Sequence, residues 1–197
     1  MSQLLILGSA SERRQAILGE LGVPFEILIP DVVEVFLEAD PPGTARENAR
    51  RKHEWCRSRR PHHHILAADT IVAFEGRCVT KPSSLEEAAR FLHMFSGKPQ
   101  SVFTALAMSA PRSEPEMAIV ESTVTFRTLS PEAIQDYLSK VIPLDKAGGY
   151  DINQHGDLIV ESYSGSYTNI MGLPKEAVAA WLDREGLCLG RAAPGRG

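Results

Sequence analysis

The segment that decides the fold is QLLILGSASERRQAILGELG, residues 3–22. Its apolar run from Gln3 to Leu7 predicts a short buried strand, and the GSAS that follows predicts a loop. Apolar residues then recur at helical spacing between positions 16 and 21, and Gly22 is suited to end that helix. We therefore expect a strand, a loop and a helix, which together form the first unit of an α/β fold.

The rest of the chain continues this alternation. We expect further strands at 25–29, 65–74, 101–108, 118–126 and near 158–162, and helices at about 44–60, 83–95, 130–137 and 175–185. The two long strands joined through residues 111–115 are expected to pair in antiparallel fashion. The prediction is an α/β fold with a mixed, twisted β-sheet flanked by helices, in two lobes around a central cleft. Residues 1–189 are expected to form one domain, and 190–197 a disordered tail.

Composition excludes several classes of protein. With 197 residues and 43% hydrophobic content, the chain can bury one core or two joined lobes. A formal net charge of −4 gives no chain-wide attraction to nucleic acid or to an anionic membrane, and we expect neither as a partner. The three cysteines include no Cys-x-x-Cys pair, and no segment approaches the ~18 apolar residues of a membrane span. Since the N-terminal segment also lacks a basic flank, we expect a cytoplasmic protein.

Ser9, Ser11, Arg13 and Arg14 lie where the first strand passes into the first helix. Free backbone N–H groups, hydroxyls and guanidiniums can converge on one anion there, so the segment is a candidate phosphate cradle. It lacks the Gly-Lys-Ser/Thr ending of a Walker motif. The alternative is that Ser11 only caps the helix while both arginines lie on its solvated face.

Asp69 interrupts the apolar strand ILAADTIVAF, residues 65–74. An unpaired carboxylate in such a strand is costly, so something must compensate it, and a divalent cation such as Mg²⁺ or Mn²⁺ is a candidate. Thr70 adds a hydroxyl beside it. Glu34 or Glu38 could supply a second carboxylate ligand, although a surface position is expected for Glu38. The alternative is that Asp69 anchors a turn through backbone hydrogen bonds.

Other basic residues are also candidates. Lys52, Lys81 and Lys146 could each neutralise a phosphate, although a lone lysine is usually solvated surface. The run His62-His63-His64 predicts an exposed connection, because three consecutive strand residues cannot all face one metal.

Together these segments resemble the Maf family of nucleotide pyrophosphatases. The family's Ser-x-Ser-x-Arg-Arg loop is matched at residues 9–14 and its Ala-Asp-Thr strand at 68–70. The match also includes Lys52, Lys81-Pro82, Ser96-Gly97, TFRTL (125–129), DKAGGY (145–150) and GSYTNIMGLP (165–174). The resemblance therefore spans nearly the whole chain.

The resemblance implies a fold like that of inosine triphosphate pyrophosphatases and a definite reaction. A nucleoside triphosphate would be hydrolysed between its α and β phosphates, giving the monophosphate and pyrophosphate. Asp69 would accept the proton of the attacking water, and a divalent metal, Mg²⁺ or Mn²⁺, would be held by Asp69 and Glu34. The basic residues Arg13, Arg14, Lys52 and Lys81 would steady the triphosphate. The resemblance also implies a homodimer.

The choice of base is less sharply marked. In family terms Arg13, Thr70 and the position of Asn153 select the base, and the first two fit the dTTP/UTP group. Asn153 stands where a glutamine is expected, and Asp151 replaces a small residue, so an N7-methyl-GTP pyrophosphatase is an alternative. A nucleotide-sensing regulator of cell division is an alternative of another class, against which the retention of Asp69 beside a basic loop argues.

Overall fold

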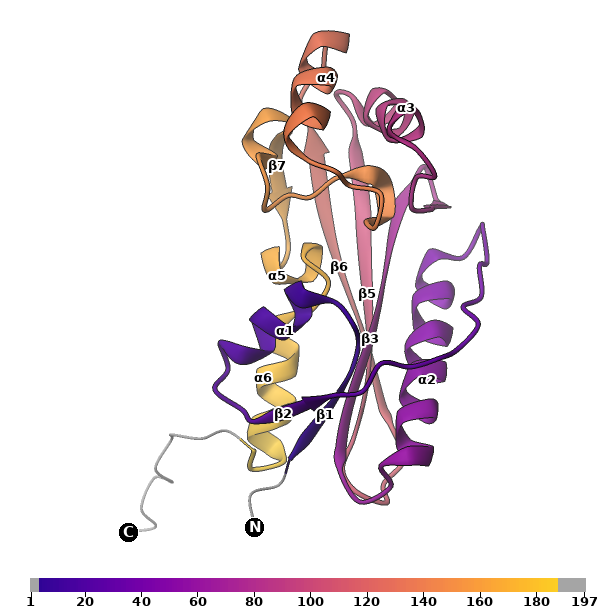
Figure 1. Cartoon of the computed structure of the whole chain (residues 1–197), viewed down its shortest axis with the longest axis vertical. Helices are drawn as coiled ribbons and strands as arrows, with labels where there is room; N and C mark the ends of the chain where they lie inside the picture. The colour runs from indigo at the N-terminus through magenta and orange to yellow at the C-terminus, as the bar shows by residue number, and fades with distance from the viewer. Residues whose placement is uncertain (1–3, 188–197) are drawn as a thin grey trace.

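The structure is a computed structural model that describes residues 4–187 (Figure 1). The strands are β1 (Leu5–Gly8), β2 (Phe25–Ile27), β3 (His64–Phe74), β4 (Arg77–Val79), β5 (Pro99–Ser109), β6 (Glu116–Phe126) and β7 (Val160–Ser164). The helices are α1 (Glu12–Gly19), α2 (Pro41–Arg59), α3 (Leu85–Phe95), α4 (Pro131–Lys140), α5 (Tyr167–Ile170) and α6 (Lys175–Arg184), with 3-10 turns η1 (Ala147–Gly149) and η2 (Gly156–Leu158). The strands of this described range form one mixed seven-stranded sheet, which confirms the predicted α/β class.

The sheet has a parallel part and an antiparallel part. Its strand order is β2-β1-β3-β5-β6-β7, with β4 paired to β3. β1 lies parallel to both β2 and β3, and helices α1 and α2 make the crossovers that parallel pairing requires. β3, β5 and β6 are long antiparallel strands, as predicted for the last two, and they extend through most of the molecule's length (Figure 1).

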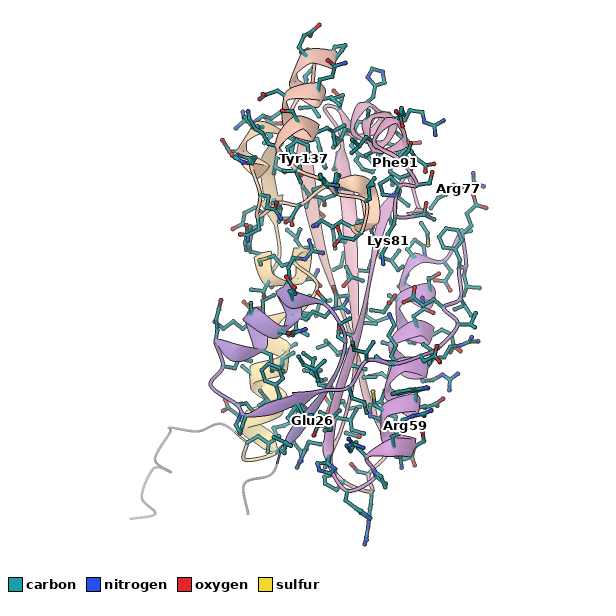
Figure 2. All side chains as sticks on the ribbon, in the orientation of Figure 1. Glu26, Arg59, Arg77, Lys81, Phe91 and Tyr137 are labelled. Carbon is teal, nitrogen blue, oxygen red and sulfur yellow. The ribbon has the colours of Figure 1, made fainter. Side chains whose placement is uncertain are left out.

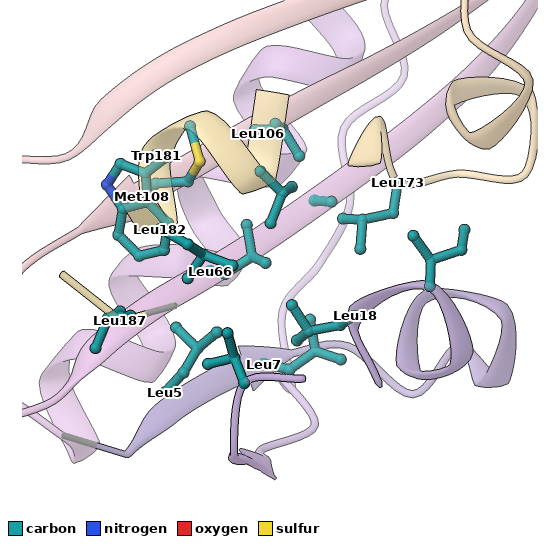
Figure 3. Close-up of a cluster of buried hydrophobic side chains, with 14 residues drawn as sticks. Leu5, Leu7, Leu18, Leu66, Leu106, Met108, Leu173, Trp181, Leu182 and Leu187 are labelled. Atoms are coloured by element: carbon teal, nitrogen blue, oxygen red, sulfur yellow. The ribbon is translucent and has the colours of Figure 1, made fainter. Parts of the chain in front are cut away.

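Side chains alternate across β3 and divide the core. Leu66 belongs to a cluster that β1, α1 and α6 complete, which includes Leu5 and Trp181 (Figure 3). Further along the same face, Phe74 belongs to a second cluster with residues of α3 and α4. The opposite face packs against α2, where small side chains such as Ala49 allow a close approach. One continuous sheet thus carries two separate clusters, and the parts of the molecule built around the first and the second cluster are its two lobes.

One edge of β3 is left open between its two partners on that side. β1 pairs with β3 as far as Ala67, and β4 pairs with β3 only from Val72 onward. β5 pairs with the other edge of β3 throughout. Residues 68–71 therefore face a gap that begins at the carboxyl end of parallel strand β1. Ligands of α/β proteins bind at such positions.

The structure corrects several predictions about local structure. Helix α2 begins at Pro41 rather than near Thr44, because Asp40 caps it and proline is suited to a first helical turn. The three-residue strand β4 and the short helix α5 were not predicted. His64 is buried in β3 beside Trp181, so the predicted exposed connection is wrong for that residue. The predicted tail at 190–197 lies outside the described residues.

Candidate active site

The loop between β1 and α1 forms one wall of the candidate site. Ser11 caps α1, because its Oγ accepts a hydrogen bond from the backbone N–H of Arg14 at 3.4 Å. Ser9 Oγ accepts a hydrogen bond from the backbone N–H of Ser11 at 3.2 Å. The two hydroxyls therefore shape the loop, and the start of α1 provides backbone N–H groups that favour an anion.

Arg14 fastens this loop to the rest of the site. Its guanidinium donates to Gly172 O at 2.7 Å, to Ser9 Oγ at 3.2 Å and to Thr70 Oγ1 at 2.9 Å. Burial lowers the pKa of Arg14, and the nearby charge of Asp69 acts in the opposite direction; an arginine retains its charge under such a shift. The alternative that both arginines lie on the solvated face is therefore wrong for Arg14, which joins α1, β3 and the loop before α6.

Asp69 lies at the open edge of β3 and is 6% exposed. Its Oδ1 accepts a hydrogen bond from Lys52 Nζ at 2.5 Å, and its Oδ2 accepts one from Asn48 Nδ2 at 3.4 Å. Both partners project from α2. The compensation that an aspartate in an apolar strand requires is thus supplied, among the residues of the described chain, by an ammonium group and an amide.

Glu34 is brought to the same ammonium from the segment between β2 and α2. Its Oε1 lies 2.5 Å from Lys52 Nζ. The segment is held in place by Asn48, whose Oδ1 accepts from Val35 N at 2.8 Å and whose Nδ2 donates to Val35 O at 3.1 Å. Asn48 therefore positions the chain that carries Glu34 and also contacts Asp69.

The two carboxyls have opposite pKa shifts. Burial raises the pKa of Asp69, and the charges of Lys52 and Arg14 oppose that rise without cancelling it. Burial also acts to raise the pKa of Glu34, but the hydrogen bond and charge of Lys52, with smaller effects of Lys81 and Arg14, lower it overall. Glu34 is therefore the more acidic partner, and Asp69 is the better proton acceptor.

Arg13 and Asn153 both contact Asp151. Arg13 Nη1 donates to Asp151 Oδ2 at 3.2 Å, and the backbone N–H of Asn153 donates to Asp151 Oδ1 at 3.0 Å. Asp151 is 3% exposed. Two residues predicted to select the base are thus joined by a third whose role was not predicted.

The remaining lysines and the second glutamate occupy separate positions. Lys81 is exposed on the segment after β4 (Figure 2), and its charge reaches Glu34. Lys146 Nζ lies 2.7 Å from Asp145 Oδ1 and 3.8 Å from Asp151 Oδ2. Glu38 pairs with Arg77 on the surface, as expected, and takes no part in the site.

The structure thus assembles most of the predicted residues into one polar centre. Direct contacts join these residues in two groups: Arg14 binds Ser9 and Thr70 beside the Ser11 cap, and Lys52 binds Asp69 and Glu34. The two groups meet in β3, where Asp69 and Thr70 are adjacent. A surface hollow of about 480 Å³ lies elsewhere, at the start of α2, and none of the predicted residues lines it. Sequence reasoning missed Asn48, because an asparagine on a charged helix is indistinguishable from a solvated one without its neighbours.

This arrangement has the chemistry that a phosphate anhydride requires. A proton acceptor of raised pKa lies beside a fixed guanidinium, an ammonium and the N-terminus of a helix, and these groups suit a polyanion. Among residues 4–187, no group of three or more histidine, cysteine, aspartate or glutamate side chains forms a metal site. Mg²⁺ in nucleotide enzymes is commonly held by one or two carboxylates and the phosphates themselves, so Asp69 and Glu34 fit that ligand set.

Within the described residues, no helix combines the length and apolar character needed to cross a membrane.

Solved structures include one of similar fold, that of the Staphylococcus aureus Ham1 protein. It covers 92% of this chain and 99% of its own, with a TM-score of 0.51 and 14% identity. At that identity the likeness shows the shared fold alone.

Sequence comparisons identify much nearer relatives. The dTTP/UTP pyrophosphatase of Thermotoga maritima is 40% identical over 185 residues, which cover 92% of this chain and 89% of the relative. The dTTP/UTP pyrophosphatase of Deinococcus radiodurans is 37% identical over 183 residues, which cover 93% of each chain. The family model described as Maf-like protein matches residues 4–185. The chain therefore belongs to the Maf family.

Proposed function

We propose that this chain hydrolyses nucleoside triphosphates to the monophosphate and pyrophosphate, with dTTP and UTP as its substrates. The Thermotoga and Deinococcus relatives are named dTTP/UTP pyrophosphatases, and they align over about nine-tenths of this chain. The observation that carries the proposal is the pairing of Asp69 with Lys52 at the open edge of β3, beside the loop that Arg14 fastens.

Asp69 acts as the proton acceptor for the attacking water. Burial raises its pKa, so its carboxylate is more basic than a solvated aspartate. Lys52 and Asn48 hold the two carboxylate oxygens by one contact each, which favours an orientation at the open edge. The water oxygen bonds to the α-phosphorus while a proton of the water passes to Asp69. The bond from the α-phosphorus to the oxygen that bridges it to the β-phosphorus breaks, and pyrophosphate leaves with that oxygen. No covalent enzyme intermediate is needed.

The cationic groups stabilise the triphosphate and the leaving pyrophosphate. Arg14 donates three hydrogen bonds to protein atoms. Its main contribution is therefore a fixed positive charge beside the loop between β1 and α1. A lysine ammonium has three donors, so Lys52 keeps one beside its two carboxylate contacts, and the exposed Lys81 can reach phosphate oxygens on its flexible stem. Backbone N–H groups at the start of α1 complete the cradle.

We also propose that the enzyme uses Mg²⁺ or Mn²⁺ held by Asp69 and Glu34. Both carboxylates contact the same Lys52 nitrogen, and this convergence of two carboxylates on one positive charge supports the proposal. Carboxylate oxygens are the ligands that these hard cations prefer. When bound, the metal would offset negative charge on the phosphates.

We further propose a homodimer, on the basis of the family resemblance, and a cytoplasmic location, on the basis of the spacing of the cysteines.

The test is a substrate panel. The purified full-length chain is incubated with Mg²⁺ or Mn²⁺ and dTTP, UTP, CTP, dATP, GTP or N7-methyl-GTP, and both pyrophosphate and monophosphate are quantified. We expect equal amounts of the two products, with the highest kcat/KM for dTTP and UTP. Preference for N7-methyl-GTP would reject the base assignment, and release of orthophosphate with nucleoside diphosphate would reject cleavage between the α and β phosphates.

A further inference from the structure

Asp151 is a buried carboxylate whose backbone is locked by a tyrosine of α4. The hydroxyl of Tyr137 accepts a hydrogen bond from Asp151 N at 2.8 Å and donates one to Asp151 O at 3.2 Å. Tyr137, which lies on α4 (Figure 2), is fully buried in the second hydrophobic cluster. The position of Asp151 is therefore set by the core of one lobe rather than by its exposed surroundings.

The Asp151 carboxylate joins groups from distant parts of the chain. Its Oδ2 accepts hydrogen bonds from Arg13 Nη1 at 3.2 Å and from Gln154 Nε2 at 3.0 Å, and Lys146 Nζ lies 3.8 Å from the same atom. Its Oδ1 accepts one from the backbone N–H of Asn153 at 3.0 Å. Arg13 belongs to α1, whose apolar face packs into the first cluster. The Arg13–Asp151 pair thus connects the two lobes across 138 positions of sequence.

Arg13 retains most of its binding capacity in this pair. Its side chain is 34% exposed, and Asp151 is its sole side-chain partner among residues 4–187. An arginine carries five N–H donors and no acceptor, and one nitrogen is engaged here. The remaining donors can bind only a hydrogen-bond acceptor. Because Asp151 already holds the guanidinium, Arg13 loses little further conformational entropy when it binds such an acceptor.

We propose that Asp151 is a positioning residue for base selection: it orients Arg13 so that the free N–H groups meet a keto oxygen of the pyrimidine. This inference rests on the proposed function. Uracil and thymine present a keto oxygen at position 4, whereas cytosine presents an amino donor there. A donor-only group in a fixed orientation therefore favours UTP and dTTP over CTP. Asp151 also contacts the 153–154 segment, but it acts on the base through Arg13.

The experiment compares kcat/KM for UTP and CTP in the full chain. Asp151→Asn keeps the shape of the side chain but removes the charge that holds Arg13. The matched control is Asp157→Asn, which changes an exposed aspartate nearby in the same region. We expect Asp151→Asn to reduce the UTP-to-CTP ratio of kcat/KM about tenfold, as loss of one charge-assisted hydrogen bond would do, and the control to leave it unchanged. The ratio is compared only between variants that circular dichroism shows to be folded, because a partial loss of folding lowers both values together without changing base preference.

A double-mutant cycle then separates positioning from a general electrostatic effect. In an Arg13→Met background, Asp151→Asn should leave the ratio unaltered, because its effect passes through Arg13. An unchanged ratio in the Asp151→Asn single variant, or a further fall in the Arg13→Met background, would overturn the proposal.

Binding gives a second readout that does not depend on turnover. The Kd ratio of UMP to CMP, measured by calorimetry on the same variants, should shift in the same direction as the kinetic ratio. If the wild-type chain binds UMP more tightly than CMP but hydrolyses no triphosphate, the proposed reaction fails while the role of Asp151 is still decided by this ratio. A wild-type chain that binds neither nucleotide would overturn both.

Discussion

Lys52 and Asp69 form an ion pair with 2.5 Å between Nζ and Oδ1, and the aspartate is almost completely buried. The same nitrogen lies 2.5 Å from Glu34 Oε1. One ammonium therefore serves two carboxylates, and the trio has a net charge of −1 while both carboxyls are ionised. Such a centre can accept a cation at the carboxylates and a polyanion at the ammonium, which is the combination that a metal-bound triphosphate presents.

Asp69→Asn should abolish most turnover while preserving the fold. We expect kcat to fall by about 10²–10⁴-fold, because the variant lacks the proton acceptor at nearly constant volume. Since burial raises the pKa of Asp69, its ionised form is disfavoured in the folded chain, and the variant should melt at the same temperature as the wild type or higher. Steady-state kinetics and thermal melts followed by circular dichroism measure the two effects. A folded variant with near-normal kcat would exclude Asp69 as the base.

Lys52→Met should destabilise the chain strongly at neutral pH. It leaves the Asp69 and Glu34 carboxylates without their shared cation, and breaking a buried pair in this way costs about 3–5 kcal/mol. Protonation of the two carboxylates relieves the repulsion between them. The loss of unfolding free energy should therefore be larger at pH 8 than at pH 5. Urea denaturation at both pH values measures it. Lys140→Met is the control, because its pair with Asp136 is exposed and is worth under about 1 kcal/mol.

Glu34→Gln should weaken metal binding more than it weakens nucleotide binding. We expect the Mn²⁺ concentration for half-maximal activity to rise about tenfold or more, since one of two protein carboxylates is lost. Chelation by EDTA should remove the activity of the wild type, and added Mg²⁺ or Mn²⁺ should restore it. Mn²⁺ binding followed by electron paramagnetic resonance gives a readout without turnover. Glu38→Gln, an exposed change away from the site, should behave as wild type; an equal response of both variants would remove Glu34 from the ligand set.

Arg14→Lys should not be a conservative change. The guanidinium of Arg14 reaches acceptors on Ser9, Thr70 and Gly172, and one ammonium cannot reproduce that planar geometry. We expect a loss of about 2–4 kcal/mol in unfolding free energy, because acceptors in a partly buried site lose their donors. Arg184→Lys, at an exposed pair with Glu116, should cost under about 1 kcal/mol. Similar losses in both variants would show that the three contacts add little.

His53 should make the fold sensitive to acid. Burial lowers its pKa to about 4, and its Nε2 lies 2.8 Å from Ser109 Oγ. Between the ordinary pKa of histidine near 6.5 and this value, the unfolded chain binds a proton that the folded chain does not. Stability contributed by neutral His53 is therefore complete above pH 6.5 and is lost as the pH falls toward 4, by up to ~3 kcal/mol.

Denaturation at several pH values checks this contribution of His53. A His53→Gln variant should lose less stability across that pH range than the wild type does. His62→Gln, at an exposed histidine, should keep the wild-type slope. Identical slopes in all three proteins would place the acid sensitivity elsewhere.

The sequence predicted the central features of the site because those features are local. Asp69 stands out in an apolar strand, and the loop at residues 9–14 lies at a strand-to-helix junction, so both are recognisable from a few neighbours. The long strands were predicted for the same reason. Strand β4 has only three residues and no periodicity of its own, and it forms because β3 offers an edge at Val72.

The contacts that were missed join distant positions. Asn48 is one polar residue on a charged helix, and its role becomes evident only when the backbone of Val35 lies beside it. In the sequence, Asp151 was only a departure from the expected specificity motif. Its contact with Arg13 was missed because the two residues are 138 positions apart. His64 was expected to be exposed with its two neighbours, but the first residue of a buried strand faces α6 and packs on Trp181. Such contacts depend on tertiary packing, which no local pattern encodes.

The continuity of the long strands has a consequence for motion. β3 contributes Leu66 to the first hydrophobic cluster and Phe74 to the second, and β5 likewise contributes Met108 and Val102. Bending one lobe toward the other would distort these continuous paired strands, so a large hinge closure is energetically opposed. We expect the enzyme to enclose its substrate by movements of side chains and of the segment carrying Glu34. The framework that holds Asp69 would then enter each catalytic cycle already in its working geometry.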